Sequence, residues 1–176
     1  MGVTTPLIMV ITGNGKGKTT SAFGQVLRAT GHGFRSLVVQ FVKSGFPYGE
    51  VTASRHLPGV EVRSMGLGYV DGPHAREIPR SEHREAALEA LAYCRERAGD
   101  VDFLVMDEVN FALSKDLITE EEILSFLDER PAGLTVILTG RGAPAYLIDR
   151  ADLVSEVREV KHPYRKGILA QKGIES

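Results

Sequence analysis

Short apolar runs alternate along the chain with stretches whose apolar residues recur at helical spacing. Short, mainly apolar stretches predict strands buried in the core, and they cover residues 7–11, 36–42, 103–106, 134–138 and 153–157. Residues 60–63 alternate between apolar and charged and predict a peripheral strand. Helices are expected over residues 18–31, 50–57, 81–98, 119–131 and 145–151. Strands that alternate with helices predict an α/β fold with a mostly parallel central sheet and right-handed crossovers.

Local signals mark the starts of two of these helices. Ser81 is a typical N-cap residue and is expected to begin the helix over residues 81–98. Thr119 and Glu122 have the spacing of a capping box, and Pro131 ends the helix that they begin. We therefore expect both helices to have side-chain caps.

Residues 11–22 read ITGNGKGKTTSA and lie between an expected strand and an expected helix. This order is what a phosphate-binding P-loop requires, because its glycines let backbone N–H groups point inward and the helix adds the positive end of its dipole. Lys18 would carry charge to phosphate oxygens, and Thr19 would offer its hydroxyl to Mg²⁺. The usual first glycine of the pattern is replaced by Thr12. The expected ATP contacts in this loop are Gly13, Asn14, Gly15, Lys16, Gly17, Lys18, Thr19 and Thr20.

Two further strand ends carry polar residues that a P-loop protein uses. Asp107 and Glu108 follow an apolar run, as in a Walker B strand, and their carboxylates are expected beside the P-loop with one of them on Mg²⁺. The alternative is an incidental acidic strand end. Arg141 lies in a glycine-containing loop at the same edge and would reach triphosphate oxygens, unless it is simply solvated.

Two segments are expected to have neither helix nor strand. Residues 65–80 are rich in glycine and proline and also carry aromatic and charged residues. A loop of this length is typical of a lid over a substrate or of a disordered segment. Residues 158–176 form a basic C-terminal tail, which would either contact an anionic ligand or be solvated.

Composition narrows the function classes. A chain of 176 residues is most simply one domain, over residues 1–176. A net charge of −2 gives no electrostatic case for a nucleic-acid partner. Cys94 is the single cysteine, which excludes a disulfide within one chain and predicts a small core residue. The absence of a signal-peptide pattern and of an apolar run near roughly 18 residues predicts a cytoplasmic protein with no membrane contact.

Several longer stretches together resemble one family, the P-loop ATP:corrinoid adenosyltransferases of cobalamin biosynthesis and salvage, which act on cob(I)alamin or cob(I)yrinic acid a,c-diamide. The resemblance covers nearly the whole chain. The sequence of the P-loop and that of the C-terminal tail are specific to this family. The stretches that carry it are GNGKGKTT (13–20), VVQFVK (38–43), MDE (106–108), LTGRG (138–142) and VKHPYRKGILAQKGIE (160–175).

The resemblance implies a three-layer RecA-like P-loop fold, a homodimer, and transfer of the 5′-deoxyadenosyl group of ATP to the cobalt of a reduced corrinoid with release of triphosphate. It implies that ATP lies with C5′ rather than the γ-phosphorus toward the acceptor, which fits the missing glycine at Thr12. Lys18, Thr19 and Glu108 would be the catalytic residues, and Thr19, Asp107 and Glu108 would hold Mg²⁺. The chemistry also implies a transient electron-donor protein such as a flavoprotein.

The family typically has a G-x-G-F-T-W segment whose aromatic residues press on the lower face of the corrinoid. The corresponding residues here are 66–71, so Gly68 and Tyr69 would contact the corrinoid and Asp71 replaces the tryptophan. Two other functions share the P-loop and the acidic strand end. A small P-loop kinase or NTPase would release ADP or phosphate instead of triphosphate, and a non-catalytic sensor of ATP or corrinoid would bind without turnover.

Overall fold

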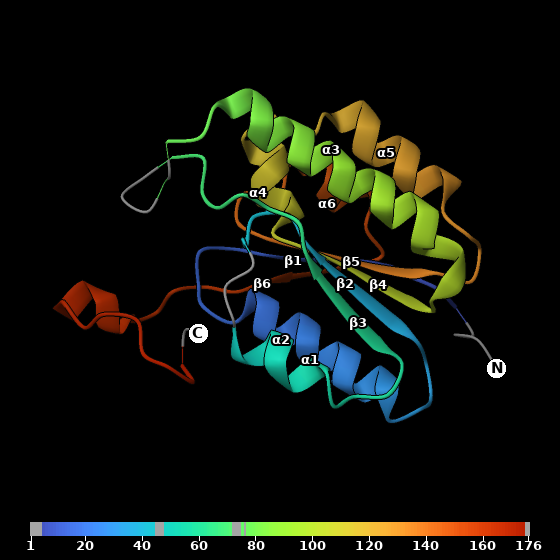
Figure 1. Ribbon diagram of the computed structural model, residues 1–176, viewed down its shortest axis with the longest axis horizontal. Coiled ribbons are helices and arrows are strands. Elements are labelled where there is room, and N and C mark those ends of the chain that lie inside the picture. Colours follow the sequence, from blue (N-terminus) through green and yellow to red (C-terminus); the bar gives the residue numbers. More distant parts are fainter. Residues whose placement is uncertain (1–4, 45–47, 72–74, 76, 175–176) are drawn as a thin grey trace.

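The central feature of the computed structural model, which describes residues 5–44, 48–71, 75 and 77–174, is a parallel β-sheet (Figure 1). In these residues the sheet has six strands in the order β3-β2-β4-β5-β1-β6, and every neighbouring pair is parallel. The strands are β1 (Ile8–Thr12), β2 (Ser36–Gln40), β3 (Val60–Ser64), β4 (Phe103–Asp107), β5 (Thr135–Thr139) and β6 (Leu153–Glu156). The predicted parallel sheet is confirmed.

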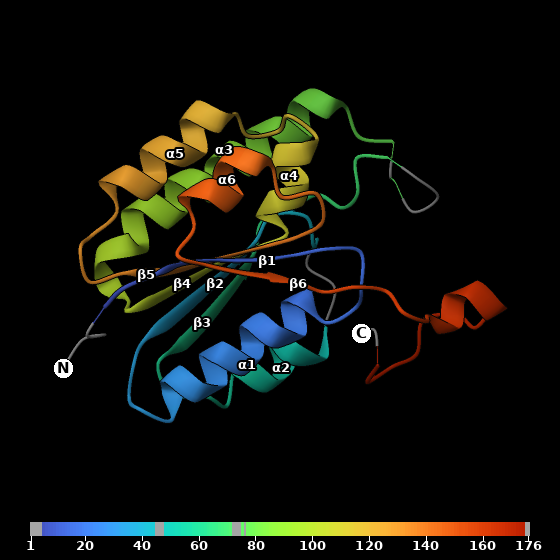
Figure 2. The ribbon, with the colours of Figure 1, turned by 180° about the vertical axis from the view of Figure 1, so that it is seen from behind.

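Helices cover both faces of this sheet, which makes three layers (Figures 1 and 2). One face carries α1 (Lys18–Thr30) and α2 (Gly49–Ser54). The other carries α3 (Arg80–Arg97), α4 (Val109–Ser114), α5 (Glu120–Glu129) and α6 (Ala145–Arg150), with the short 3-10 helix η1 (Ala98–Asp100) after α3. A second 3-10 helix, η2 (Pro163–Lys166), lies in the C-terminal segment, which extends away from the sheet. None of the helices in the described part of the chain has the length and apolar character needed to span a bilayer.

Strands β2, β4 and β5 are buried at every position, as their mainly apolar sequences predict. Successive side chains of a strand point to opposite faces, so each strand contributes to two cores. In β4, Leu104 and Met106 join the larger core on one face, and Phe103 and Val105 join the smaller core that includes residues of α1. Cys94 is completely buried in the larger core, as predicted.

The last strand, β6, is not the core strand that its apolar residues predicted. All four of its residues are exposed, and Leu153 and Val154 retain 39% and 41% of their accessible surface. The prediction was wrong because β6 pairs only with β1 in the sheet order and forms one edge of the sheet. The peripheral position predicted for β3, at the other edge, is confirmed.

Helix starts agree with the sequence in one case and differ in another. Thr119 and Glu122 form the predicted capping box, since the Thr119 side chain accepts from the Glu122 N–H and the Glu122 carboxylate accepts from the Thr119 N–H. Ser81 is not a cap, because α3 begins one residue earlier, at Arg80, directly after Pro79. Pro79 has extended backbone angles and occupies the N-cap position without a side-chain hydrogen bond. Helix α4 was not predicted at all.

Candidate active site

The carboxyl ends of all the strands meet at one edge of the parallel sheet, where open α/β sheets bind their ligands. A cavity of about 1300 Å³ lies there. Its walls come from the P-loop after β1, from residues after β2, β3, β4 and β5, and from the C-terminal segment after β6. Tyr69, Glu108, Phe111 and Arg141 are among the lining residues. The structure therefore brings most of the predicted site residues to one place.

The P-loop is packed closely beneath the C-terminal segment. The Gly15 N–H donates to the Val157 carbonyl at 2.7 Å. A Cβ on Gly15 would lie 2.7 Å from the backbone carbonyl carbon of Arg158, and one on Gly13 would lie 2.4 Å from the Val157 oxygen. These two glycines are thus required by close backbone approach, whereas Gly17 has open space and needs its freedom for a φ of 121°. Gly13 does not line the cavity, unlike the other predicted loop residues from Asn14 to Thr20.

Thr12, which replaces the usual first glycine, has a structural role. Its hydroxyl accepts from the Ala143 N–H at 3.2 Å, and its carbonyl accepts from the Val157 N–H at 2.8 Å. Thr12 therefore joins the base of the P-loop to the loop after β5 and to the segment after β6.

Lys18 begins α1 and is the buried cation of the loop, with 6% of its surface exposed. Its ammonium donates to the Gly15 carbonyl at 2.8 Å. Burial lowers the pKa of Lys18, and the nearby Arg141 acts in the same direction, while the carboxylates of Glu108 and Asp107 oppose this. The ammonium is thus held at the cavity wall between cationic and anionic neighbours.

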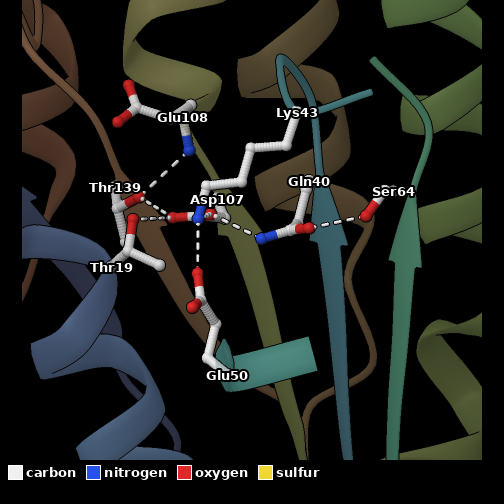
Figure 3. A network of polar contacts seen from close by, with 8 residues as sticks. All are labelled: Thr19, Gln40, Lys43, Glu50, Ser64, Asp107, Glu108 and Thr139. Carbon is white, nitrogen blue, oxygen red and sulfur yellow. Dashed lines mark hydrogen bonds and ion pairs between the residues drawn. The ribbon is translucent and has the colours of Figure 1, made fainter. Parts of the chain in front are cut away.

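The Asp107 carboxylate is the centre of a buried polar network (Figure 3). One oxygen, Oδ1, accepts hydroxyl hydrogen bonds from Thr19 and Thr139, both at 2.8 Å. The other, Oδ2, accepts from Gln40 Nε2 at 3.1 Å and lies 3.5 Å from Lys43 Nζ. Asp107 has no exposed surface and does not line the cavity. It acts on the cavity through the P-loop threonine that it holds.

Gln40, the last residue of β2, and Lys43, three residues later, complete this network, although the sequence indicated no role for them. The Gln40 amide oxygen accepts from the Ser64 hydroxyl at 2.6 Å, which turns the Gln40 NH₂ group toward Asp107. Lys43 Nζ donates to Glu50 at 2.7 Å. Burial alone would lower the pKa of Lys43, but the carboxylates of Asp107 and Glu50 outweigh it and raise the pKa. The available signal was a polar residue at the end of a buried strand for Gln40, and a lysine directly after the apolar residues 41–42 for Lys43.

Glu108 has a backbone conformation that side chains other than glycine rarely adopt, with φ 63° and ψ 18°. Its N–H donates to Thr139 Oγ1 at 3.0 Å, which ties this left-handed turn to Asp107 through the shared threonine. The turn places the Glu108 carboxylate on the cavity wall, away from Asp107 (Figure 3). Burial raises the pKa of Glu108, and the negative charge of Asp107 raises it further.

Arg141 is exposed but faces the same cavity from the loop after β5. The loop requires glycine on either side of it, because Gly140 and Gly142 have φ values of 133° and 68°. The charge of Arg141 acts on the pKa of both Lys18 and Glu108, so the three groups lie within electrostatic reach of one another.

Comparison with known proteins shows which family has a sequence like that of this chain. Residues 4–176 match the family described as ATP:corrinoid adenosyltransferase BtuR/CobO/CobP. The chain is 41% identical over 172 residues to the corrinoid adenosyltransferase of Escherichia coli (strain K12), covering 96% of this chain and 85% of that protein. It is 41% identical over 174 residues to the corrinoid adenosyltransferase CobA of Salmonella typhimurium (strain LT2), with the same coverage. For the Pseudomonas aeruginosa corrinoid adenosyltransferase, the identity is 40% over 173 residues, with 96% and 83% covered.

The chain belongs to the ATP:corrinoid adenosyltransferase family. The resemblance noted from the motifs is confirmed, and the parallel sheet with helices on both faces is consistent with the RecA-like P-loop fold expected of a member.

The donor atoms of this family member suit Mg²⁺ when phosphate oxygens complete its coordination. Mg²⁺ prefers hard oxygen ligands, retains several waters and commonly takes only one or two carboxylates. The Thr19 hydroxyl and the carboxylates of Asp107 and Glu108 are such ligands, and Thr19 already contacts Asp107. Among the described residues no group of three or more His, Cys, Asp or Glu could hold a metal ion. Thr19 and Glu108 line the cavity and fit a site shared with phosphate, whereas Asp107, which has no exposed surface, would act on the ion through Thr19.

The segment predicted to contact the corrinoid follows β3 and reaches the cavity through Tyr69 and Asp71. The Gly68 N–H donates to the Val42 carbonyl at 2.8 Å, and Gly68, with φ 104°, does not itself line the cavity. Tyr69 does line it, with 47% of its surface exposed, and burial raises the pKa of its phenol. Residues 72–74 and 76 lie outside the described residues, so the lid function of residues 65–80 stays a prediction.

The C-terminal segment forms the wall of the cavity that crosses the P-loop. Arg158, His162 and Arg165 all line the cavity. Over residues 158–174 every residue is exposed except His162, which is half-buried and accepts the Tyr164 N–H on Nδ1. The sequence predicted a basic tail without distinguishing His162, because a turn toward the cavity leaves no periodic signal. Contact of this tail with an anionic ligand stays a prediction.

Proposed function

We propose that this chain transfers the 5′-deoxyadenosyl group of ATP to the Co(I) of a reduced corrinoid and releases triphosphate. One observation carries the proposal beyond family membership. The P-loop of this chain opens on a cavity of about 1300 Å³, which is larger than a nucleotide alone requires and has walls on several separate elements. Such a cavity provides room for a second, large substrate beside the nucleotide.

The reaction is a displacement at carbon. Two electrons of Co(I) form the cobalt–carbon bond to C5′, the C5′–oxygen bond breaks, and its electron pair leaves with the triphosphate. Because Co(I) is itself a strong nucleophile, no activated serine or cysteine is needed, and the only cysteine, Cys94, is buried in the core. The protein has to align C5′ with cobalt, and alignment of this kind is worth up to roughly 7–11 kcal/mol.

The leaving triphosphate gains negative charge at the oxygen that departs from C5′, so its stabilisation is the second task of the site. Lys18, the N–H groups of the P-loop and Arg141 would contact its oxygens, and Lys16 adds a further cation at the cavity wall. Bound Mg²⁺ would supply positive charge to the same oxygens, and Thr19, Asp107 and Glu108 would hold it directly or through water. Asp107 orients Thr19 for this role by accepting its hydroxyl hydrogen bond.

Other parts of the proposal follow from the chemistry and from the sequence. Co(I) has to be supplied by an external reductant, which implies a transient electron donor such as a flavoprotein. Contact of Tyr69 with the corrinoid, a homodimer, a single domain over residues 1–176 and a cytoplasmic location are further predictions.

An anaerobic assay with ATP, Mg²⁺ and chemically reduced cobalamin tests the proposed function. We expect the absorption spectrum of an alkyl-cobalt product and one equivalent of triphosphate for each corrinoid consumed. Release of ADP or phosphate with unchanged corrinoid would instead indicate a P-loop kinase or NTPase. Binding of both substrates without any product would indicate a sensor.

A further inference from the structure

Tyr69 is held at the rim of the cavity by contacts with α4. Its ring meets the ring of Phe111 edge-on, at 5.8 Å between centroids and an angle of 88°. Both rings line the cavity. Two residues along the chain, Asp71 Oδ2 accepts from Lys115 Nζ at 2.7 Å. The same ammonium lies 5.5 Å from the centroid of the Phe111 ring, so one lysine contacts both the acidic residue and the aromatic platform.

Among the described residues, the backbone hydrogen bonds of the segment after β3 extend only as far as Gly68. The N–H groups of Met65 and Gly66 donate to the Gln40 carbonyl, and that of Gly68 donates to the Val42 carbonyl. Beyond Gly68 the contacts come from side chains. Val70 packs against the larger core, while Tyr69 and Asp71 reach α4 and the residue after it. Side-chain contacts therefore decide where the Tyr69 ring lies.

The residues that follow α4 also hold the far end of this loop. Arg80, the first residue of α3, donates to the Lys115 carbonyl and lies 3.4 Å from the Asp116 carboxylate. Asp71 is thus tied to Lys115, and Arg80 is tied to Lys115 and its neighbour Asp116. Because α4 begins directly after Glu108, these contacts relate the Tyr69 side of the cavity to the acidic end of β4.

We propose that Lys115 is a positioning residue for the corrinoid. By pairing with Asp71 it keeps the Tyr69 ring against Phe111, and it thereby presents an aromatic surface to the second substrate at the cavity rim. The inference rests on the proposed function for the identity of that substrate. Lys115 does not line the cavity, so its effect passes through Asp71, Phe111 and Tyr69.

The exposure of the pair sets the size of the effect. The side chains of Asp71 and Lys115 retain 60% and 31% of their accessible surface, so water and salt weaken their attraction. Ion pairs of this kind change an equilibrium constant by at most about fivefold. We therefore expect a moderate change in corrinoid affinity. The affinity for ATP should not change. Among the described residues, no hydrogen bond or ion pair joins Lys18 or the rest of the P-loop to Asp71 or Lys115.

Steady-state kinetics of Lys115→Met test the inference. We expect the KM for corrinoid to rise about threefold to fivefold with the KM for ATP unchanged, and Lys115→Arg to stay close to wild type. The matched control is Arg150→Met, which removes an exposed ion pair to Asp128 of similar length, 2.9 Å, and should change neither constant. An unchanged corrinoid KM in an active Lys115→Met enzyme would overturn the inference.

Charge reversal provides a second test. Asp71→Lys and Lys115→Asp each place like charges together, so each single variant should raise the corrinoid KM. The double variant restores an attractive pair in the opposite sense and should return the KM to within about twofold of wild type. Failure of the double variant to improve on either single variant would mean that the pair does not position the segment.

A fluorescence measurement without corrinoid separates this inference from the proposed function. The chain has no tryptophan, so Tyr69→Trp introduces a single indole at the cavity rim. Adding Lys115→Met should release that indole from Phe111 and raise its rate of quenching by acrylamide about twofold, whereas adding Arg150→Met should leave the rate unchanged. Equal quenching in all three proteins would refute the positioning role, even if the wild-type enzyme forms the alkyl-cobalt product.

Discussion

A single methyl group at Gly15 is expected to separate the P-loop from the C-terminal segment that covers it. An added Cβ would lie 2.7 Å from the Arg158 carbonyl carbon and 2.8 Å from the carbonyl oxygens of both Val157 and Arg158. All three atoms belong to the backbone, so no side-chain rotation can relieve the contact. The hydrogen bond from the Gly15 N–H to the Val157 carbonyl, at 2.7 Å, would lengthen as the two segments part.

Overpacking of this kind typically lowers the free energy of unfolding by about 1–3 kcal/mol. We expect Gly15→Ala to lie in that range in urea denaturation followed by far-UV circular dichroism. We also expect a higher KM for ATP, because Gly15 and Arg158 both line the cavity. The matched control is Gly24→Ala within α1, where an added Cβ has no heavy atom within 4 Å.

The control should increase stability by about 0.4–1 kcal/mol, since alanine restricts the unfolded chain and favours the helix. The reasoning would be refuted by a Gly15→Ala protein with wild-type stability and a wild-type KM for ATP. Destabilisation by Gly24→Ala would contradict the expectation that a methyl group is accommodated in the open space beside Gly24.

Three further outcomes are expected. Lys18→Ala should lower kcat/KM at least about 100-fold because it removes a cation from the leaving triphosphate, while His32→Ala, at an exposed position, should stay near wild type in the same assay. A hydrogen bond from Arg97 holds the pKa of Glu61 at about 2, below its ordinary 4.5, so this pair contributes stability above pH 4.5 that is lost as the pH falls toward 2. In acid titrations of unfolding, Glu61→Gln should therefore lose about 1 kcal/mol less stability than the wild type between pH 4.5 and pH 2. Burial raises the pKa of the Cys94 thiol, so a thiol reagent should modify it only in the unfolded protein; rapid reaction with the native protein would contradict this.

The parts of the fold that sequence could predict are those whose burial is uniform. Strands β2, β4 and β5 lie in the middle of the sheet with both faces covered, so the middle of each strand is a run of three or more apolar residues that is visible in the sequence. The edge strand β6 also begins with apolar residues, and nothing in its local sequence distinguishes an edge strand from a central one. Its exposure follows from the strand order, which depends on pairings across the whole chain.

Part of the candidate site could likewise be predicted from the sequence, and part could not. The P-loop is local, because its glycines, lysine and threonine are adjacent in sequence and their spacing follows from the loop geometry. The network around Asp107 is not local, since it joins Thr19 and Gln40 to Asp107 across 88 and 67 positions. The role of Lys43 depends on that network, and Lys115 depends on a contact with Asp71 across 44 positions. Only the fold shows such pairings.

The most direct test of the central claim follows the 5′ carbon of ATP. ATP labelled with ¹³C at that position alone is incubated anaerobically with the enzyme, Mg²⁺ and reduced cobalamin, and the products are separated and examined by ¹³C NMR. We predict that the label appears in the corrinoid, bonded directly to cobalt, with an equal amount of triphosphate in solution. Recovery of the label in ADP, with phosphate released and the corrinoid unlabelled, would contradict the account.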